Sequence, residues 1–262
     1  ARTWGNFVLN GEIFYRSNDP YYHFRSVQYV VEHWPATMPF DPWTYFAHGT
    51  ANSQFGTLFD QLIGTAALII GLGSPSETLV RKVVLFAPPV FGALILIPAY
   101  FIGRRLGGRI AGITAAAVVA FSTGELLSRS LVGFTDHQVA EALFAAIAVL
   151  GMLAALAVAA REKPVYELVE AREWGALRQT LGWSLLAGVG VAAYLWVWPP
   201  GIMLVGIIGV FFLLQLTVAY LRGNSPEHAA FVGVVAMGTA GILNIATLHS
   251  LTFVPTGRSL YQ

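Results

Sequence analysis

Three ionisable side chains lie close together in a short polar segment between two long apolar stretches. Arg129 is followed by Asp136 and His137 within residues 128–138. Ionisable groups are costly to hold near hydrocarbon, so their presence at the edge of apolar stretches indicates a functional site. A carboxylate can bind a hard divalent cation, and a guanidinium can grip a phosphate through paired N–H groups. With the imidazole, the segment therefore predicts a phosphate and metal centre.

Asp136 also has a more ordinary explanation. It precedes an apolar stretch that begins near Val139, so its carboxylate could cap the first turn of a helix. Glu141 would then be a first-turn residue that the helix dipole favours. The nearby Arg129 favours the functional interpretation, because a helix cap does not require a guanidinium.

A second acidic residue lies far upstream, in a segment rich in turn-forming and aromatic residues. Asp19 stands between Asn18 and Pro20, close to His23. Aspartate before proline commonly opens a turn or a helix by accepting backbone hydrogen bonds. The alternative is that Asp19 provides an oxygen ligand to a divalent cation, although one carboxylate alone would make a weak site. The residues by themselves leave both explanations open.

An aromatic segment at residues 194–200 closes one of the later apolar stretches. Its tryptophans, Trp196 and Trp198, are typical of the aromatic belt that membrane helices place at the lipid–water interface. The alternative is a groove for a substrate lipid or peptide, to which His23 would also contribute.

The composition is that of an integral membrane protein. Apolar residues make up 56% of the chain and charged residues 11%, with a mean hydropathy of +0.63. A soluble domain has about 25% charged residues. The net charge is only +1, so nothing indicates a nucleic-acid partner. The absence of cysteine excludes disulfides and thiolate metal sites.

The apolar stretches predict a helix bundle over residues 80–250, since a hydrocarbon core of about 30 Å requires roughly 20 residues per helix. We expect about six spans, at 83–103, 110–127, 139–160, 181–198, 201–221 and 229–248. Three prolines in the first span, Pro88, Pro89 and Pro98, are expected to kink it and not to break it. Residues 251–262 would begin a further outer segment.

Residues 1–79 are expected to form a long first loop with helices at the membrane interface. A short helix is predicted over residues 22–32, where apolar residues recur at helical spacing. The stretch 55–73 is ambiguous, because it is short, is interrupted by glycines and contains Asp60 and Gln61.

Lys and Arg in short loops predict the orientation, because such loops stay on the cytoplasmic side. The loops at 103–109, at 161–180 and at Arg222 are basic, and helical pairs separate them, so all three can be cytoplasmic together. Asp136 then lies on the outer face. Asp19 shares that face only if residues 55–73 do not cross the membrane.

Three segments in this order resemble the landmarks of a known enzyme family. They are Asn-Asp-Pro-Tyr-Tyr-His-Phe-Arg at 18–25, Ser-Arg-Ser-Leu-Val-Gly-Phe-Thr-Asp-His at 128–137 and Tyr-Leu-Trp-Val-Trp-Pro at 194–199. The chain resembles the catalytic subunit of oligosaccharyltransferases, most closely the AglB type of haloarchaea. The resemblance implies an all-α polytopic membrane protein with a GT-C-type glycosyltransferase helix bundle and a long first outer loop. It also implies that 55–73 stays at the interface.

Enzymes of this family move a glycan from a dolichol-linked phosphate or diphosphate donor to Asn in the Asn-X-Ser/Thr sequence of acceptor proteins, outside the cell membrane. The resemblance implies that Asp19 and Asp136 are catalytic residues that bind Mn²⁺ or Mg²⁺, and that Arg129 binds the donor phosphate. An inverting displacement without a covalent enzyme intermediate is expected. Gln138 would be a weak metal ligand, since relatives commonly carry Glu or His at its position, and His137 would be a second weak ligand beside it.

The resemblance also predicts what residues 1–262 lack. The first membrane helix, a later carboxylate of the metal site and the soluble C-terminal domain that reads the acceptor are missing, so we expect an N-terminal fragment that is inactive alone. Two other functions stay open. One is another lipid-phosphate-sugar transferase, such as a protein O-mannosyltransferase, and the other is half of a transporter, for which kinked helices are also typical. The ionisable residues cluster at one membrane face and not in mid-span, which favours a transferase.

Overall fold

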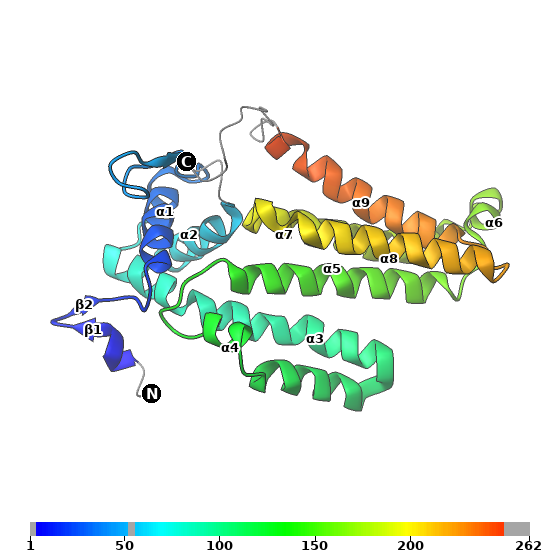
Figure 1. Ribbon diagram of the computed structural model, residues 1–262, viewed down its shortest axis with the longest axis horizontal. Helices are drawn as coiled ribbons and strands as arrows, with labels where there is room; N and C mark the ends of the chain where they lie inside the picture. Colours follow the sequence, from blue (N-terminus) through cyan, green and yellow to red (C-terminus); the bar gives the residue numbers. More distant parts are fainter. Residues whose placement is uncertain (1–3, 52–55, 249–262) are drawn as a thin grey trace.

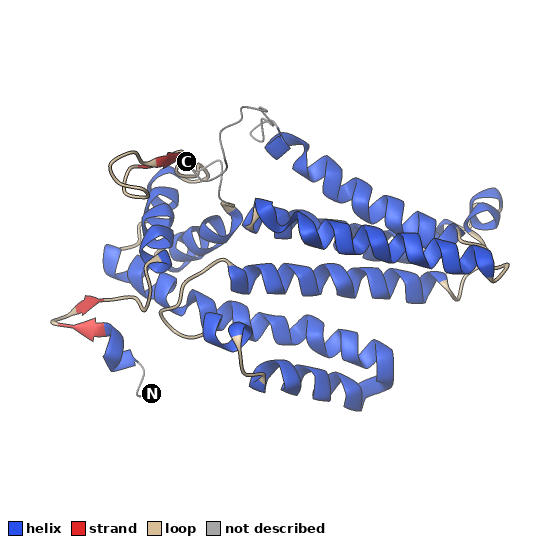
Figure 2. Cartoon of the chain, in the orientation of Figure 1, coloured by secondary structure: helices blue, strands red, loops and turns tan. Residues whose placement is uncertain are grey.

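The structure, a computed structural model, describes residues 4–51 and 56–248. Helices dominate these residues, with two short antiparallel strand pairs in the N-terminal region (Figure 1, Figure 2). The strands are β1 Val8–Leu9 with β2 Glu12–Ile13, and β3 Phe40–Asp41 with β4 Thr50–Ala51. The helices are α1 Asp19–His33, α2 Leu58–Ile70, α3 Glu77–Phe121, α4 Glu125–Arg129, α5 Gln138–Ala159, α6 Val165–Glu170, α7 Trp174–Val197, α8 Ile202–Leu221 and α9 Glu227–Leu248, with 3₁₀ turns η1 Trp4–Phe7 and η3 Pro199–Gly201.

Five helical segments in the described chain are long and apolar enough to cross a membrane, which confirms a multi-pass membrane protein. The first of them, α3, turns back on itself at Gly107 and Gly108, whose backbone angles are not helical (Figure 1). The two arms lie against each other: a Cβ on Gly112 would lie 2.8 Å from the carbonyl oxygen of Tyr100. These arms correspond to the first two predicted spans.

The second predicted span is wrong at its C-terminal end. α3 ends at Phe121, and α4 follows as a separate short helix. The chain leaves helical geometry at Ser122, which is extended, and turns into α4 at Gly124, whose φ of 120° L side chains rarely adopt. Arg129 therefore lies on a helix of its own and not at the end of a span.

The ambiguous stretch forms α2, which is too short to cross a membrane. Its 13 residues extend over about 20 Å, against about 30 Å of hydrocarbon. It packs against α1, α3 and α7 near the end of the bundle where α1 lies (Figure 1). This agrees with the expectation that these residues stay at the interface. The short helix predicted at 22–32 is confirmed as α1, which begins earlier, at Asp19.

The three basic loops lie together at one end of the bundle. They are the turn within α3, the region of α6 and the turn between α8 and α9, and all are far from α1 and α2 (Figure 1). The loop of Asp136 lies at the opposite end, with α1 and α2. The prediction that these loops share a side is confirmed. The segment 251–262 lies outside the described residues.

Small residues let α5 and α7 approach closely in the middle of the bundle. A Cβ on Gly151 would lie 2.7 Å from the backbone nitrogen of Ala187, and one on Gly190 would lie 2.8 Å from that of Ala148. Such contacts are typical of packed membrane helices. They fix the position of α5 against α7, and α5 begins directly after Asp136 and His137.

Candidate metal and phosphate site

Asp136 is held against α3 through its neighbour Thr135. Pro88 has no N–H, so the carbonyl oxygen of Val84, one helical turn earlier, has no helical donor. The Thr135 hydroxyl donates to this oxygen at 2.7 Å, and Thr135 is fully buried. Since a buried carbonyl without a partner is costly, this hydrogen bond fixes the backbone directly before Asp136.

Pro89 repeats the arrangement one residue later. The carbonyl oxygen of Leu85 that it leaves free accepts the backbone N–H of Gly133 at 3.0 Å. Gly133 has a φ of +80°, and a Cβ there would lie 2.5 Å from Cε1 of Phe7, so the position requires glycine. Its own carbonyl accepts the N–H of Arg16 at 3.0 Å, which ties the loop to the segment after β2.

Thr135→Val is expected to destabilise the protein without changing a side chain of the site. Valine fills nearly the same volume but cannot donate, so the Val84 carbonyl loses its partner at a cost of about 1–3 kcal/mol. Thermal unfolding in detergent measures this loss. Thr135→Ser is the matched control, because it keeps the hydroxyl. If the valine variant unfolds at the wild-type temperature, the hydrogen bond does not hold the loop.

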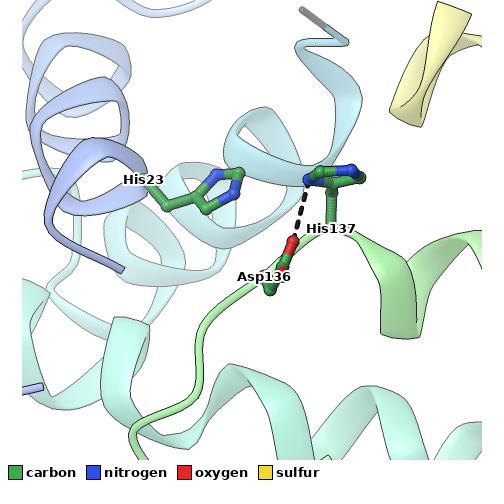
Figure 3. A group of neighbouring side chains, drawn as sticks. All are labelled: His23, Asp136 and His137. Carbon is green, nitrogen blue, oxygen red and sulfur yellow. Dashed lines mark ion pairs between the residues drawn. The ribbon is translucent and has the colours of Figure 1, made fainter. Parts of the chain in front are cut away.

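The Asp136 carboxylate is buried and lies between a guanidinium and an imidazole. Its Oδ2 accepts from Nη1 of Arg129 at 2.7 Å, and its Oδ1 lies 2.9 Å from Nδ1 of His137 (Figure 3). Burial alone would raise the pKa of Asp136, but His137, His23 and Arg129 together hold it below its usual value. The interpretation of Asp136 as the helix cap is wrong. The residue at the N-cap position of α5 is His137, and the side chain of His137 makes no capping hydrogen bond.

Arg129 lies between two carboxylates and over an aromatic ring. Its Nε donates to Glu125 at 2.9 Å, one turn earlier on α4, and its Cζ lies 4.8 Å from the ring centre of Phe134. Partial burial would lower the pKa of Arg129, but the hydrogen bond to Glu125 and the charge of Asp136 raise it. The side chain is 25% exposed, so a fixed cation faces the space in front of Asp136.

His23 approaches Asp136 from α1 and is itself held by a carboxylate of α2. Its Nδ1 lies 2.7 Å from Oδ1 of Asp60, and the two residues are 4% and 1% exposed. Burial would lower the pKa of His23, but the charge and hydrogen bond of Asp60, with the charges of Asp136 and Asp19, raise it. His23 lines the cavity in front of Asp136, although most of its side chain is buried.

Three ligand atoms from different parts of the chain come together at this point. One nitrogen or oxygen each of His23, Asp136 and His137 lies within 4.8 Å of the others, and Figure 3 shows the two rings on either side of the carboxylate. Oδ1 of Asp136 is buried, and among the described residues it lies 2.9 Å from Nδ1 of His137 without a well-aligned hydrogen bond. Imidazole nitrogen and carboxylate oxygen are ligands for divalent metal ions. The residues present therefore fit a divalent cation.

The cluster faces a cavity of about 700 Å³ that also collects most of the other predicted site residues. Asp19, Arg129, Gln138 and Trp198 line it. Asp19 is exposed in the first turn of α1, and Asn18 takes the cap position instead. The predicted pairing of Asp19 with Asp136 on one side of the membrane is thus consistent with the geometry, because both reach one cavity.

The two tryptophans of the aromatic segment have different surroundings. Trp198 stacks on His137, with ring centres 4.4 Å apart and planes 21° apart. Trp196 does not line this cavity, and its indole N–H is buried with no hydrogen-bond partner among the described residues. Only Trp198 is in a position to contact a substrate in the cavity.

Residues 7–259 match the family described as oligosaccharyl transferase STT3, N-terminal. The chain belongs to the STT3 family. It is 54% identical over its whole length to the dolichyl-monophosphooligosaccharide–protein glycotransferase AglB of Haloferax volcanii, and covers 25% of that protein. It is 26% identical over 91% of its length to dolichyl-phosphooligosaccharide-protein glycotransferase 3 of Archaeoglobus fulgidus, and covers 26% of it. The chain thus spans about a quarter of the length of the curated relatives it matches.

Solved STT3-family structures share the fold. The archaeal oligosaccharyltransferase AglB of Archaeoglobus fulgidus, in complex with an inhibitory peptide and a dolichol-phosphate, superposes with a TM-score of 0.78 at 25% identity. The match covers 92% of this chain and 27% of that one. A second structure of this enzyme, tethered to an acceptor peptide with the NVT sequon, gives the same TM-score. The predicted all-α membrane fold of the family is confirmed.

One residue next to the candidate site was not identified as such from the sequence. Asp60 appeared only as a polar residue that made a short apolar stretch ambiguous. That position was a usable signal, because an acidic residue in an apolar helix is retained only with a partner. Its partner, His23, lies on another helix, which the sequence does not indicate.

Proposed function

We propose that this chain forms the metal- and donor-binding part of an oligosaccharyltransferase active site. The reaction transfers a glycan from a dolichol-linked phosphate or diphosphate donor to the side-chain nitrogen of Asn in an Asn-X-Ser/Thr acceptor, with inversion at the sugar carbon. We place the site on the extracellular face of the cell membrane, since the basic loops lie at the opposite end of the bundle.

The observation that carries the proposal is the shared cavity. Asp136 and His137 line it from the segment directly before α5, Arg129 lines it from α4, and Asp19 lines it from α1. A carboxylate pair and a fixed guanidinium in one cavity suit a metal ion and a phosphate. The named ligands of the solved relatives, a dolichol-phosphate and a sequon peptide, support the same substrate classes for this chain.

The residues have separate tasks in this reaction. Asp136 and Asp19 would hold Mn²⁺ or Mg²⁺, with His137 and Gln138 as weaker ligands, and the bound ion would act as a Lewis acid toward the departing phosphate. Arg129 donates to the phosphate oxygens, because its paired N–H groups match their geometry. An amide nitrogen is a poor nucleophile, so fixed positions and preorganised charge provide most of the acceleration.

Family membership argues against both alternative functions. A protein O-mannosyltransferase would share an acidic first loop, but the chain matches the STT3 family over residues 7–259. A transporter half would place its ionisable residues at mid-membrane, whereas this cluster lies at one end of the bundle.

Removal of divalent cations tests the proposal directly. Chelation is expected to lower glycan transfer to an Asn-X-Thr peptide by the full-length protein by at least about 100-fold, and added Mn²⁺ should restore it. Transfer from a dolichol-linked glycan is measured by the mobility shift of a fluorescent peptide. A peptide with Gln in place of Asn is the control. Transfer that persists unchanged without any divalent cation would refute the metal-dependent reaction.

A further inference from the structure

The His23–Asp60 pair is a buried acid and base for which the reaction proposed above has no use. Both side chains are almost fully buried, and Nδ1 of His23 lies 2.7 Å from Oδ1 of Asp60. Oδ2 of Asp60 is also buried and has no hydrogen-bond partner in the described part of the chain. Such a pair is costly to bury, so it calls for a specific role.

Local packing brings the pair together. Asp60 and Gly64 lie one turn apart on α2, and His23 lies on the buried face of α1 with Val30. A Cβ on Gly64 would lie 2.6 Å from Cγ1 of Val30, so only glycine lets the two helices come this close. The ring of Phe59 meets the His23 ring edge-on at 5.1 Å and limits its rotation.

The hydrogen bond to Asp60 decides which nitrogen of His23 is available. With Nδ1 bound to the carboxylate, the proton of a neutral ring sits on Nδ1 and the lone pair of Nε2 is left for the cluster with Asp136 and His137. Metal-ligating histidines commonly donate their other N–H to a carboxylate in this way, which fixes the ring and makes it a better ligand.

We propose that Asp60 is a positioning residue that holds His23 as a nitrogen ligand of the divalent cation in the cavity. This inference rests on the proposed function, because it requires the cation to bind at Asp136. It adds a buried imidazole from α1 to the ligands expected from Asp19, Asp136 and the residues after it. It also assigns α2 a task, which is to present the carboxylate behind that imidazole.

A nitrogen ligand has a consequence for metal choice. Mg²⁺ strongly prefers oxygen ligands, whereas Mn²⁺ and later first-row ions accept imidazole. His23 should therefore contribute to the binding of Mn²⁺ more than to that of Mg²⁺. Loss of His23 is expected to narrow the difference in affinity between the two ions.

The test measures Mn²⁺ binding by the full-length protein, independently of transfer. His23→Gln and Asp60→Asn are each expected to weaken Mn²⁺ binding about 10–100-fold. Replacement of a carboxylate that supports a metal-binding histidine commonly has an effect of this size. Mg²⁺ binding should change by less than about threefold in His23→Gln. In pulsed electron paramagnetic resonance of bound Mn²⁺, the imidazole nitrogen coupling should decrease in both variants. His33→Gln, an exposed histidine on the same helix, should leave all three readouts unchanged.

The outcomes separate this inference from the proposed function. If Asp136→Ala abolishes Mn²⁺ binding while His23→Gln retains wild-type affinity and nitrogen coupling, the site stands and the role of His23 and Asp60 is refuted. If Asp60→Asn lowers the unfolding temperature in chelator but leaves Mn²⁺ affinity and nitrogen coupling intact, the pair is merely structural and the inference is also refuted. If the wild type binds no Mn²⁺, both the inference and the proposed site fail.

Discussion

Replacement of Asp136 by alanine is expected to lower glycan transfer by at least about 100-fold at saturating Mn²⁺. The variant loses the buried carboxylate oxygen that lies 2.9 Å from Nδ1 of His137, in the cluster that fits a cation. It also loses the partner of Arg129 Nη1, which lies 2.7 Å away. Initial rates with an Asn-X-Thr peptide and a dolichol-linked glycan measure the effect.

Two further variants show whether the charge at Asp136 is responsible. Asp136→Asn keeps the volume and an acceptor for Arg129 but lacks the negative charge, so its loss should be nearly as large. Glu125→Gln is the matched control, because Glu125 is the other acidic partner of Arg129 and its side chain is 82% exposed. Exposed ion pairs contribute little, so transfer by this control should stay within about threefold of wild type. Undiminished transfer by Asp136→Ala would remove Asp136 from the reaction.

Arg129→Lys is expected to lower transfer about 10–100-fold, and Arg129→Ala about 1000-fold. Lysine keeps the positive charge but cannot donate two parallel hydrogen bonds to a phosphate. The loss should fall mainly on kcat, because the charge on the departing phosphate grows in the transition state. Rates measured over a series of donor concentrations separate kcat from KM.

A substitution of Phe134, whose ring lies against the guanidinium of Arg129, provides a comparison for the Arg129 variants. Phe134→Leu removes the aromatic face that lies 4.8 Å from the Cζ atom but leaves both ion pairs in place. Its transfer rate should fall less than that of Arg129→Lys, since a cation–π contact of this kind is worth about 0.5–2 kcal/mol. Equal kcat values for Arg129→Lys and wild type would mean that the paired N–H groups do not act on the phosphate.

Apolar length predicts the membrane helices of this chain well, because it is a local property. The spans expected at 139–160 and 229–248 match α5 and α9 within two residues at each end. The error at 110–127 comes from Ser122, where the backbone becomes extended and α3 ends before the apolar run does. Composition averaged over a stretch does not detect a single backbone angle of this kind.

The sequence predicted which residue types form the candidate site, but not which residues from distant parts of the chain contact them. Asp136 and Arg129 were recognisable because ionisable groups are rare beside membrane spans. The approach of His23 was not, because its partner Asp60 is 37 residues away and reaches it only through the close packing of α1 and α2.

Pro88 and Pro89 of α3 also set how far the carboxylate of Asp136 stands from the hydrocarbon. The loop is hydrogen-bonded to the carbonyls of Val84 and Leu85, which belong to a helix whose apolar length fixes its own depth in the bilayer. The position of α3 in the bilayer therefore determines the height of Asp136 above the lipid tails. The length of the loop between α4 and α5 does not. The lipid-linked phosphate of the proposed donor would be confined to the headgroup layer, and α3 would hold the carboxylate of Asp136 at the level of that phosphate.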